Sequence, residues 1–158
     1  MAFFKLKKII LLKTTFLDYQ IFQTPELPEF SAQLGGNNAR QVLVGFFDEQ
    51  SEEREAYLKK IMAAAKLNLL EDCLILRGSL ETKFPSFANL SNIHKIQKAV
   101  LFGINPLDLG LNLAIPMYQP LIFNKTAFLF VDKLSVIEPS KERRAALWTC
   151  LQRLFLAG

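Results

Sequence analysis

The nine residues from Lys98 to Pro106 constrain the fold of this chain more than any other segment. They pass from an uninterrupted apolar stretch, Ala99-Val100-Leu101-Phe102, directly into a Gly-Ile-Asn-Pro turn. A short apolar run that ends at turn residues is typical of a strand buried on both faces, as in a parallel sheet covered by helices. Ligands bind beyond the carboxyl ends of the strands in such a sheet, so the turn marks the expected position of a site.

Other segments fit the same α/β arrangement. Two further apolar strands are expected at residues 41–47 and 72–76. An amphipathic helix is expected between them, at residues 51–66. Residues 121–123 and 127–131 are strand material, and Asn124-Lys125-Thr126 between them is either a turn or an exposed stretch of one long strand. A last helix is expected from about Pro139 to residue 156, with Trp148 in its core-facing stripe.

These elements predict a three-layer α/β/α domain with a short, mainly parallel central sheet over residues 41–158. Residues 1–40 form a basic and apolar N-terminal segment followed by a connector. The chain has 158 residues, of which 51% are hydrophobic and 22% charged, so one dense core is expected. Cys73 and Cys150 fall within apolar elements, which favours buried free thiols and a reducing cytoplasm, although a single disulfide stays open.

The N-terminal segment holds the surplus of positive charge. The formal net charge is +4, and residues 1–17 contain four lysines and no acid, so direct nucleic-acid binding by the remainder is expected to be weak or absent. Its apolar run at 9–12 is too short for a signal peptide or a membrane span. The segment is a docked helix, a membrane-surface or nucleic-acid arm, or a partner-binding peptide, and paired phenylalanines beside lysines favour the last. The candidate partner-binding residues are Phe3, Phe4, Lys5, Leu6, Lys7, Lys8, Ile9 and Ile10.

Few residues suit catalysis. Asp48 follows the strand at 41–47, where α/β enzymes often hold a carboxylate, but it also suits the positive end of the next helix. The single histidine, His94, precedes its strand rather than following it, and no cysteine lies at metal-ligand spacing from it. No phosphate-binding glycine loop occurs. We therefore expect no catalytic residue, cofactor or metal, and at most a vestigial pocket at Asp48, Gly103, Asn105, Pro106 and Asp108.

Two stretches carry a resemblance to known families. Gly103-Ile104-Asn105-Pro106 resembles a motif of the uracil-DNA glycosylase superfamily, and Glu138-Pro139-Ser140 resembles its late His-Pro-Ser motif without the histidine. The region from Pro120 to Trp148 is similar to the psi subunits of bacterial DNA polymerase III holoenzymes, which are catalytically inactive relatives of that fold. The resemblance implies an accessory protein that bridges a clamp loader and a second small subunit, with residues 3–17 as the counterpart of the clamp-loader-binding segment.

The leading interpretation is therefore a non-enzymatic interaction subunit whose partners are clamp-loader and replisome accessory proteins. Two alternatives stay open. One is a DNA-base hydrolase that uses Asp48 or Asn105 to position water on a flipped base. The other is a small-ligand-binding α/β protein that uses the turn at 103–110.

Overall fold

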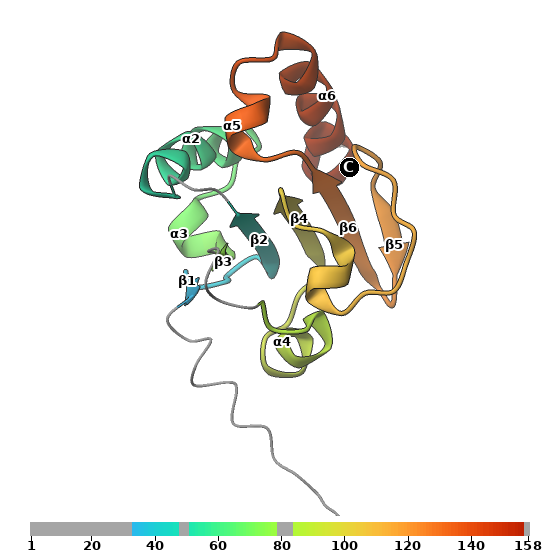
Figure 1. The fold of residues 1–158 in the computed structure, drawn as a ribbon. Coiled ribbons are helices and arrows are strands. Elements are labelled where there is room, and N and C mark those ends of the chain that lie inside the picture. Colours follow the sequence, from blue (N-terminus) through green and yellow to red (C-terminus); the bar gives the residue numbers. More distant parts are fainter. Residues whose placement is uncertain (1–32, 48–50, 79–83, 157–158) are drawn as a thin grey trace, which may run out of the picture.

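A computed structural model describes residues 33–47, 51–78 and 84–156 of the chain (Figure 1). The N-terminal residues 3–17 and Asp48 lie outside the described residues. The described helices include none that is long and apolar enough to cross a membrane. The strands are β1 Leu34–Gly35, β2 Val42–Phe47, β3 Cys73–Gly78, β4 Lys98–Phe102, β5 Leu121–Phe123 and β6 Thr126–Val131. The helices are α2 Ser51–Ala64, α3 Leu69–Asp72, α4 Phe87–Ile93, α5 Leu134–Ile137 and α6 Lys141–Leu151, with a 3-10 helix at Pro106–Leu109 and a π-helical turn at Gln152–Leu156.

The six described strands form one sheet in the order β1-β3-β2-β4-β6-β5. The four inner strands β3, β2, β4 and β6 are parallel, with Val44 of β2 opposite Ile75 of β3 and Val100 of β4. Both edge strands run antiparallel to their neighbours. The mixed α/β class is confirmed, but the expectation of a mainly parallel sheet is wrong, because each edge is closed by a strand of opposite direction.

A tight hairpin explains the antiparallel edge at β5. Asn124 and Lys125 form a two-residue turn between β5 and β6, and both have left-handed backbone angles, with φ of 52° and 67°. Turns with two positive φ angles match the twist of antiparallel strands, and asparagine is among the residues that tolerate this conformation best. Of the two alternatives for residues 124–126, the turn is therefore the correct one.

The core lies on both faces of the sheet. On one face, buried side chains of α2, α5 and α6 pack against Phe46, Phe102 and Leu129. On the other face, α4 and the segment after β4 pack against Leu43, Leu101 and Phe128. Continuous burial of β2 and β4 agrees with their apolar sequences, and it positions the carboxyl ends of these two central strands beside one another.

The expectation that Trp148 belongs to the core is wrong. Helix α6 and the following π-helical turn bury Leu147, Leu151 and Leu154, which recur at the spacing of one helical face. Trp148 lies one residue away from the start of that stripe, and 38% of its surface is exposed.

Candidate functional site

The strand order places a topological switch between β2 and β4. The chain leaves β2 through α2 to reach β3 on one side, whereas β4 pairs with β2 on the other side. The crevice at such a switch is the usual position of a ligand site in an open α/β sheet. The turn at 103–106 follows β4 at this point, as the sequence predicts.

Gly103 allows the turn to pass close to two other segments. Its φ is +72°, and its N–H donates to the carbonyl of Val131 at the end of β6, with an N···O distance of 2.9 Å. A Cβ at this position would lie 2.5 Å from Cγ of Lys133 and 3.1 Å from the carbonyl oxygen of Phe47. The glycine therefore satisfies both the left-handed backbone and the close approach of β2, β4 and β6.

The polar side chains of the turn are engaged in a helix cap. The side-chain oxygen of Asn105 accepts a hydrogen bond from the Leu107 N–H at 3.2 Å, and Asp108 Oδ2 accepts one from the Asn105 N–H, also at 3.2 Å. Pro106 occupies the first turn of the 3-10 helix, where its missing N–H costs nothing. This reciprocal arrangement is a capping box, so Asn105 and Asp108 act first as structural residues.

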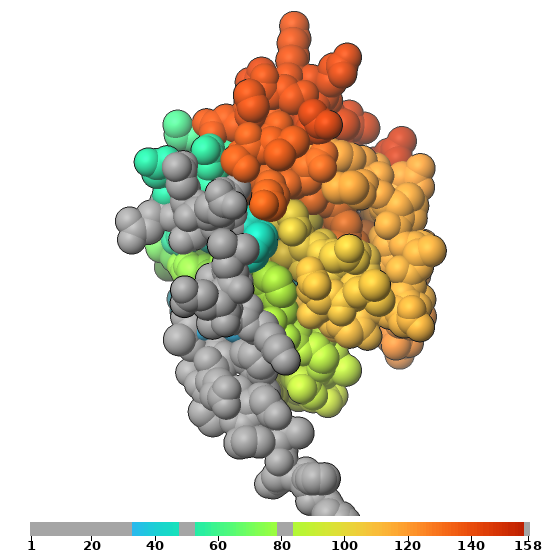
Figure 2. Space-filling model, in the orientation of Figure 1, coloured from blue at the N-terminus to red at the C-terminus, as the bar shows by residue number. Residues whose placement is uncertain are grey.

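A cavity of about 620 Å³ opens beside the turn. It brings together three predicted site residues, Gly103, Asn105 and Pro106, while Asp108 is not among its lining residues. The rest of the lining comes from the carboxyl end of β6, from the loop before β5 and from α5, and includes Ile115, Met117, Phe130, Asp132, Lys133 and Val136. The space-filling view shows the residues after β4, in yellow, meeting α5, in orange-red, on this face (Figure 2).

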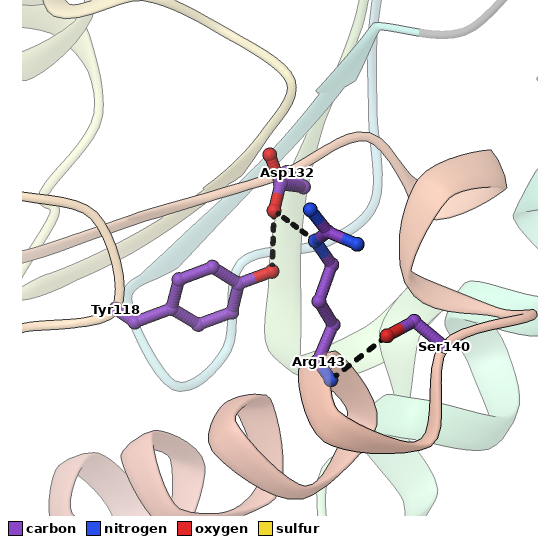
Figure 3. Close-up of polar contacts among 4 residues, drawn as sticks. All are labelled: Tyr118, Asp132, Ser140 and Arg143. Atoms are coloured by element: carbon purple, nitrogen blue, oxygen red, sulfur yellow. Dashed lines mark hydrogen bonds and ion pairs between the residues drawn. The ribbon is translucent and has the colours of Figure 1, made fainter.

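Asp132 joins three separate segments at the wall of the cavity (Figure 3). Its Oδ2 accepts hydrogen bonds from the Tyr118 hydroxyl and from Nε of Arg143, each at 2.9 Å. Arg143 stands in the first turn of α6, where its N–H donates to the Ser140 hydroxyl that caps the helix. Burial, followed by the hydrogen bond to Asp132 and its negative charge, raises the pKa of Tyr118 to about 12, so the phenol remains a hydrogen-bond donor at neutral pH.

Sequence reasoning missed Asp132 and Lys133, which come immediately after the apolar run 127–131, closer to their strand than Asn105 is to β4. The same rule about carboxyl ends of parallel strands would have found both. Lys133 lies with its ammonium 5.2 Å from the centre of the Phe47 ring, so it connects the ends of β6 and β2. Tyr118 and Arg143 had no local signal, because each reaches Asp132 from another segment of the chain.

Exposed apolar side chains line part of the cavity and lie on the neighbouring 3-10 helix. Leu107 has 66% of its surface exposed, and Met117 and Val136 are also exposed large hydrophobic residues. Met117 and Val136 line the cavity, and Leu107 belongs to the 3-10 helix that begins at the turn. Exposed apolar side chains grouped around a hollow are more typical of an interaction surface than of scattered surface residues.

Other candidate residues lie away from this cavity. His94 caps the end of α4, with its N–H donating to the Leu90 carbonyl, four residues before β4 begins. Cys73 and Cys150 are buried free thiols, and burial raises the pKa of both, that of Cys73 to about 12, so each stays a protonated packing residue. Within residues 33–47, 51–78 and 84–156, no three metal-ligating side chains gather.

No protein-family model matches the chain, and no curated protein matches it.

Proposed function

We propose that this chain is a non-enzymatic protein-interaction subunit of the DNA replication machinery, similar to psi subunits, that bridges a clamp loader and an accessory subunit. One observation carries the proposal. Asn105, Asp108 and Asp132, the polar side chains that flank the switch point, all bind other groups of the chain itself. These contacts stabilise the described part of the site, and they support a role for it that does not involve catalysis.

The engaged state of these groups argues against proton transfer by them. A general acid or base has to reach the proton that it moves, either directly or through one water. The Asn105 carbonyl oxygen already accepts the Leu107 N–H, and one oxygen of Asp132 already accepts both a phenol and a guanidinium. Proton transfer by these particular oxygens would require the contacts to break, which would remove the cap and detach the loop that carries Tyr118.

The exposed apolar side chains at the cavity suit a partner's anchor side chain. Protein interfaces place an aliphatic or aromatic anchor in a central pocket that excludes water. The cavity between Met117 and Val136 has an apolar floor that includes Phe130 and Ile104, and it is large enough for such a side chain. We propose this surface as the docking site for the accessory subunit.

The N-terminal segment supplies the second contact in this proposal. Residues 3–10 combine paired phenylalanines with three lysines, and they occupy the position of the clamp-loader-binding segment of psi subunits. An amphipathic peptide of this kind can bind a groove through its apolar side chains and gain specificity from its charges. The two contacts together would allow one small chain to connect two larger assemblies.

The direct test is to recover the tagged full-length protein from its own cells and to identify its partners by mass spectrometry. We expect clamp-loader subunits with the unmodified chain, and we expect their loss when Phe3→Ala and Phe4→Ala are combined. Met117→Glu should instead release the accessory subunit, because it places a charge among the apolar side chains at the cavity, whereas Leu70→Glu at an exposed site on α3 should change neither partner. Recovery of folded, abundant protein without clamp-loader subunits would contradict the proposal.

A second candidate function is the binding of a small ligand in the same cavity. Its volume of about 620 Å³ falls within the range of roughly 300–1,000 Å³ that is usual for such pockets. Release of a free base from uracil- or hypoxanthine-containing DNA at high protein concentration would replace both functions with that of a DNA-base hydrolase. Saturable binding of a metabolite that Met117→Glu abolishes, without any protein partner, would favour the small-ligand function.

A further inference from the structure

The edge strand β5 carries a second surface, which the proposed function does not use. β5 has no neighbour on its outer side among the described strands, and it stands at the edge of the sheet in Figure 1. All three of its residues are apolar and exposed, with 75% of the Ile122 surface open to solvent. Edge strands are normally protected by charged side chains, proline or a covering element, and β5 contains no charge.

The pairing of β5 with β6 directs the backbone N–H and C=O of Ile122 toward the open edge of the sheet. In a two-residue hairpin the residues that flank the turn form a hydrogen-bonded pair, and such pairs alternate along the ladder. Phe123 pairs with Thr126 next to the turn, so Ile122 and Ala127 form the non-hydrogen-bonded pair that follows. The N–H and C=O of Ile122 consequently point away from β6. Pro120 precedes β5 and offers no N–H, which limits pairing to a short segment around Ile122.

The surface beside β5 is positively charged. Ile122 lines a cavity of about 580 Å³ near the amino ends of β4 and β6, together with Lys95, Lys98 and Lys125. None of the described residues that line this cavity is acidic. Lys98 is fixed in place, because its ammonium donates to the Leu154 carbonyl at 2.7 Å and lies 5.1 Å from the centre of the Phe155 ring. The lysines therefore form a positive surface on the Ile122 face of the strand.

The two faces of β5 select different side chains. Leu121 and Phe123 share one face and Ile122 lies on the other, next to the lysines, because side chains alternate along a strand. A strand added outside β5 would therefore place its apolar residues over Leu121 and Phe123 and its alternate residues toward the positive cavity. We propose that β5 and this cavity bind an extended segment of another protein in which acidic and apolar residues alternate.

Charge decides between this partner and a second copy of the chain. Antiparallel pairing of two β5 strands around Ile122 would bring two lysine-lined cavities to the same extended sheet, and like charges oppose such pairing. An acidic segment instead complements the surface and gains main-chain hydrogen bonds from the open edge. The proposal does not depend on the partner's being a replication protein, and it concerns the end of the sheet opposite to the cavity at Asn105.

The test measures binding of a fluorescein-labelled peptide that alternates glutamate and valine to the full chain, by fluorescence anisotropy. Saturable binding is expected, and it should weaken roughly tenfold with Ile122→Glu, which places a negative charge beside the lysines, and about fivefold with Lys125→Glu. Raising the salt concentration from about 0.05 to about 0.5 M should weaken it as well. Two matched controls, Leu70→Glu and Lys60→Glu on exposed parts of α3 and α2, should leave the affinity unchanged.

Four results would overturn the proposal. The first is the absence of saturable binding up to about 1 mM peptide. The second is equal binding by the unmodified protein and by Ile122→Glu. The third is equal binding of a peptide in which lysine replaces every glutamate. The fourth is concentration-dependent self-association of the protein through β5, which would assign the edge to a second copy. Failure of the unmodified chain to recover clamp-loader subunits would contradict the proposed function and leave this proposal unaffected, so the two proposals fail separately.

Discussion

The two ends of the sheet use their polar and charged residues in different ways. At the carboxyl end, Asn105 and Asp108 cap a helix and Asp132 holds a loop against α6, so these groups are engaged within the chain. At the amino end, Ile122 is exposed beside a cavity lined by lysines, and no acidic side chain stands among the described residues of its lining. The comparison teaches that polar residues at the expected site position of an α/β sheet can serve the scaffold, while apolar and positively charged side chains stay exposed elsewhere on the molecule.

The largest change in the free energy of unfolding is expected at Gly103, at the carboxyl end of the sheet. Gly103→Ala should lower the free energy of unfolding by roughly 2–3 kcal/mol, because the new Cβ would meet Lys133 and the Phe47 carbonyl while the backbone keeps a left-handed angle. Gly110→Ala is the matched control, since Gly110 has a φ of +73° but, among the described residues, its Cβ would meet only Ser86 within 4 Å, at 3.4 Å. That change should cost about 1 kcal/mol. Equal costs in urea unfolding would show that Gly103 is not a point of close approach.

A smaller effect is expected where Tyr118 binds Asp132. Tyr118→Phe removes one hydrogen bond to a carboxylate that keeps Arg143, so the free energy of unfolding should fall by about 1 kcal/mol at neutral pH. The native pKa of Tyr118 is raised to about 12 from an ordinary value of 10, so its contribution is complete below pH 10 and disappears as the pH rises toward 12. Thermal melts across this range should show the unmodified protein converging on Tyr118→Phe. A constant difference between the two proteins would contradict the assigned hydrogen bond.

The smallest effect on stability is expected at the other end of the molecule. Ile122→Lys replaces an exposed side chain of an edge strand, so the free energy of unfolding should change by less than about 0.5 kcal/mol. Urea unfolding of Ile122→Lys and of Gly103→Ala would measure how differently the two ends contribute to the free energy of unfolding. A loss of several kcal/mol at Ile122 would mean that the side chain packs within the fold, and the comparison between a structural end and an open edge would then fail.

Local sequence patterns were sufficient for the centre of the fold. The apolar runs of β2 and β4 and the helical stripe of α2 identified these elements, and the Gly-Ile-Asn-Pro turn marked the end of β4 correctly. The capping role of Asn105 was also readable, because an acidic residue stands three positions later, as a capping box requires. The Tyr118–Asp132–Arg143 contacts were not readable, since they join residues 14 and 11 positions apart through the fold.

The edges of the sheet escaped prediction for a different reason. Three apolar residues at 121–123 have the same composition in a central strand as in an edge strand, and only the strand order distinguishes the two cases. Trp148 shows the same limit on a helix, because an aromatic residue adjacent to a buried stripe is placed by the rotation of the helix and not by its composition.

Residue-resolved amide hydrogen exchange at low protein concentration tests the central comparison most directly. The Gly103 N–H, bonded to the Val131 carbonyl between two central strands, should exchange only through opening events close to global unfolding. The Ile122 N–H, on the open side of β5, should exchange orders of magnitude faster. Slow exchange at Ile122 in the isolated chain, or fast exchange at Gly103, would contradict the division between a carboxyl end whose polar groups are engaged within the chain and an open edge strand.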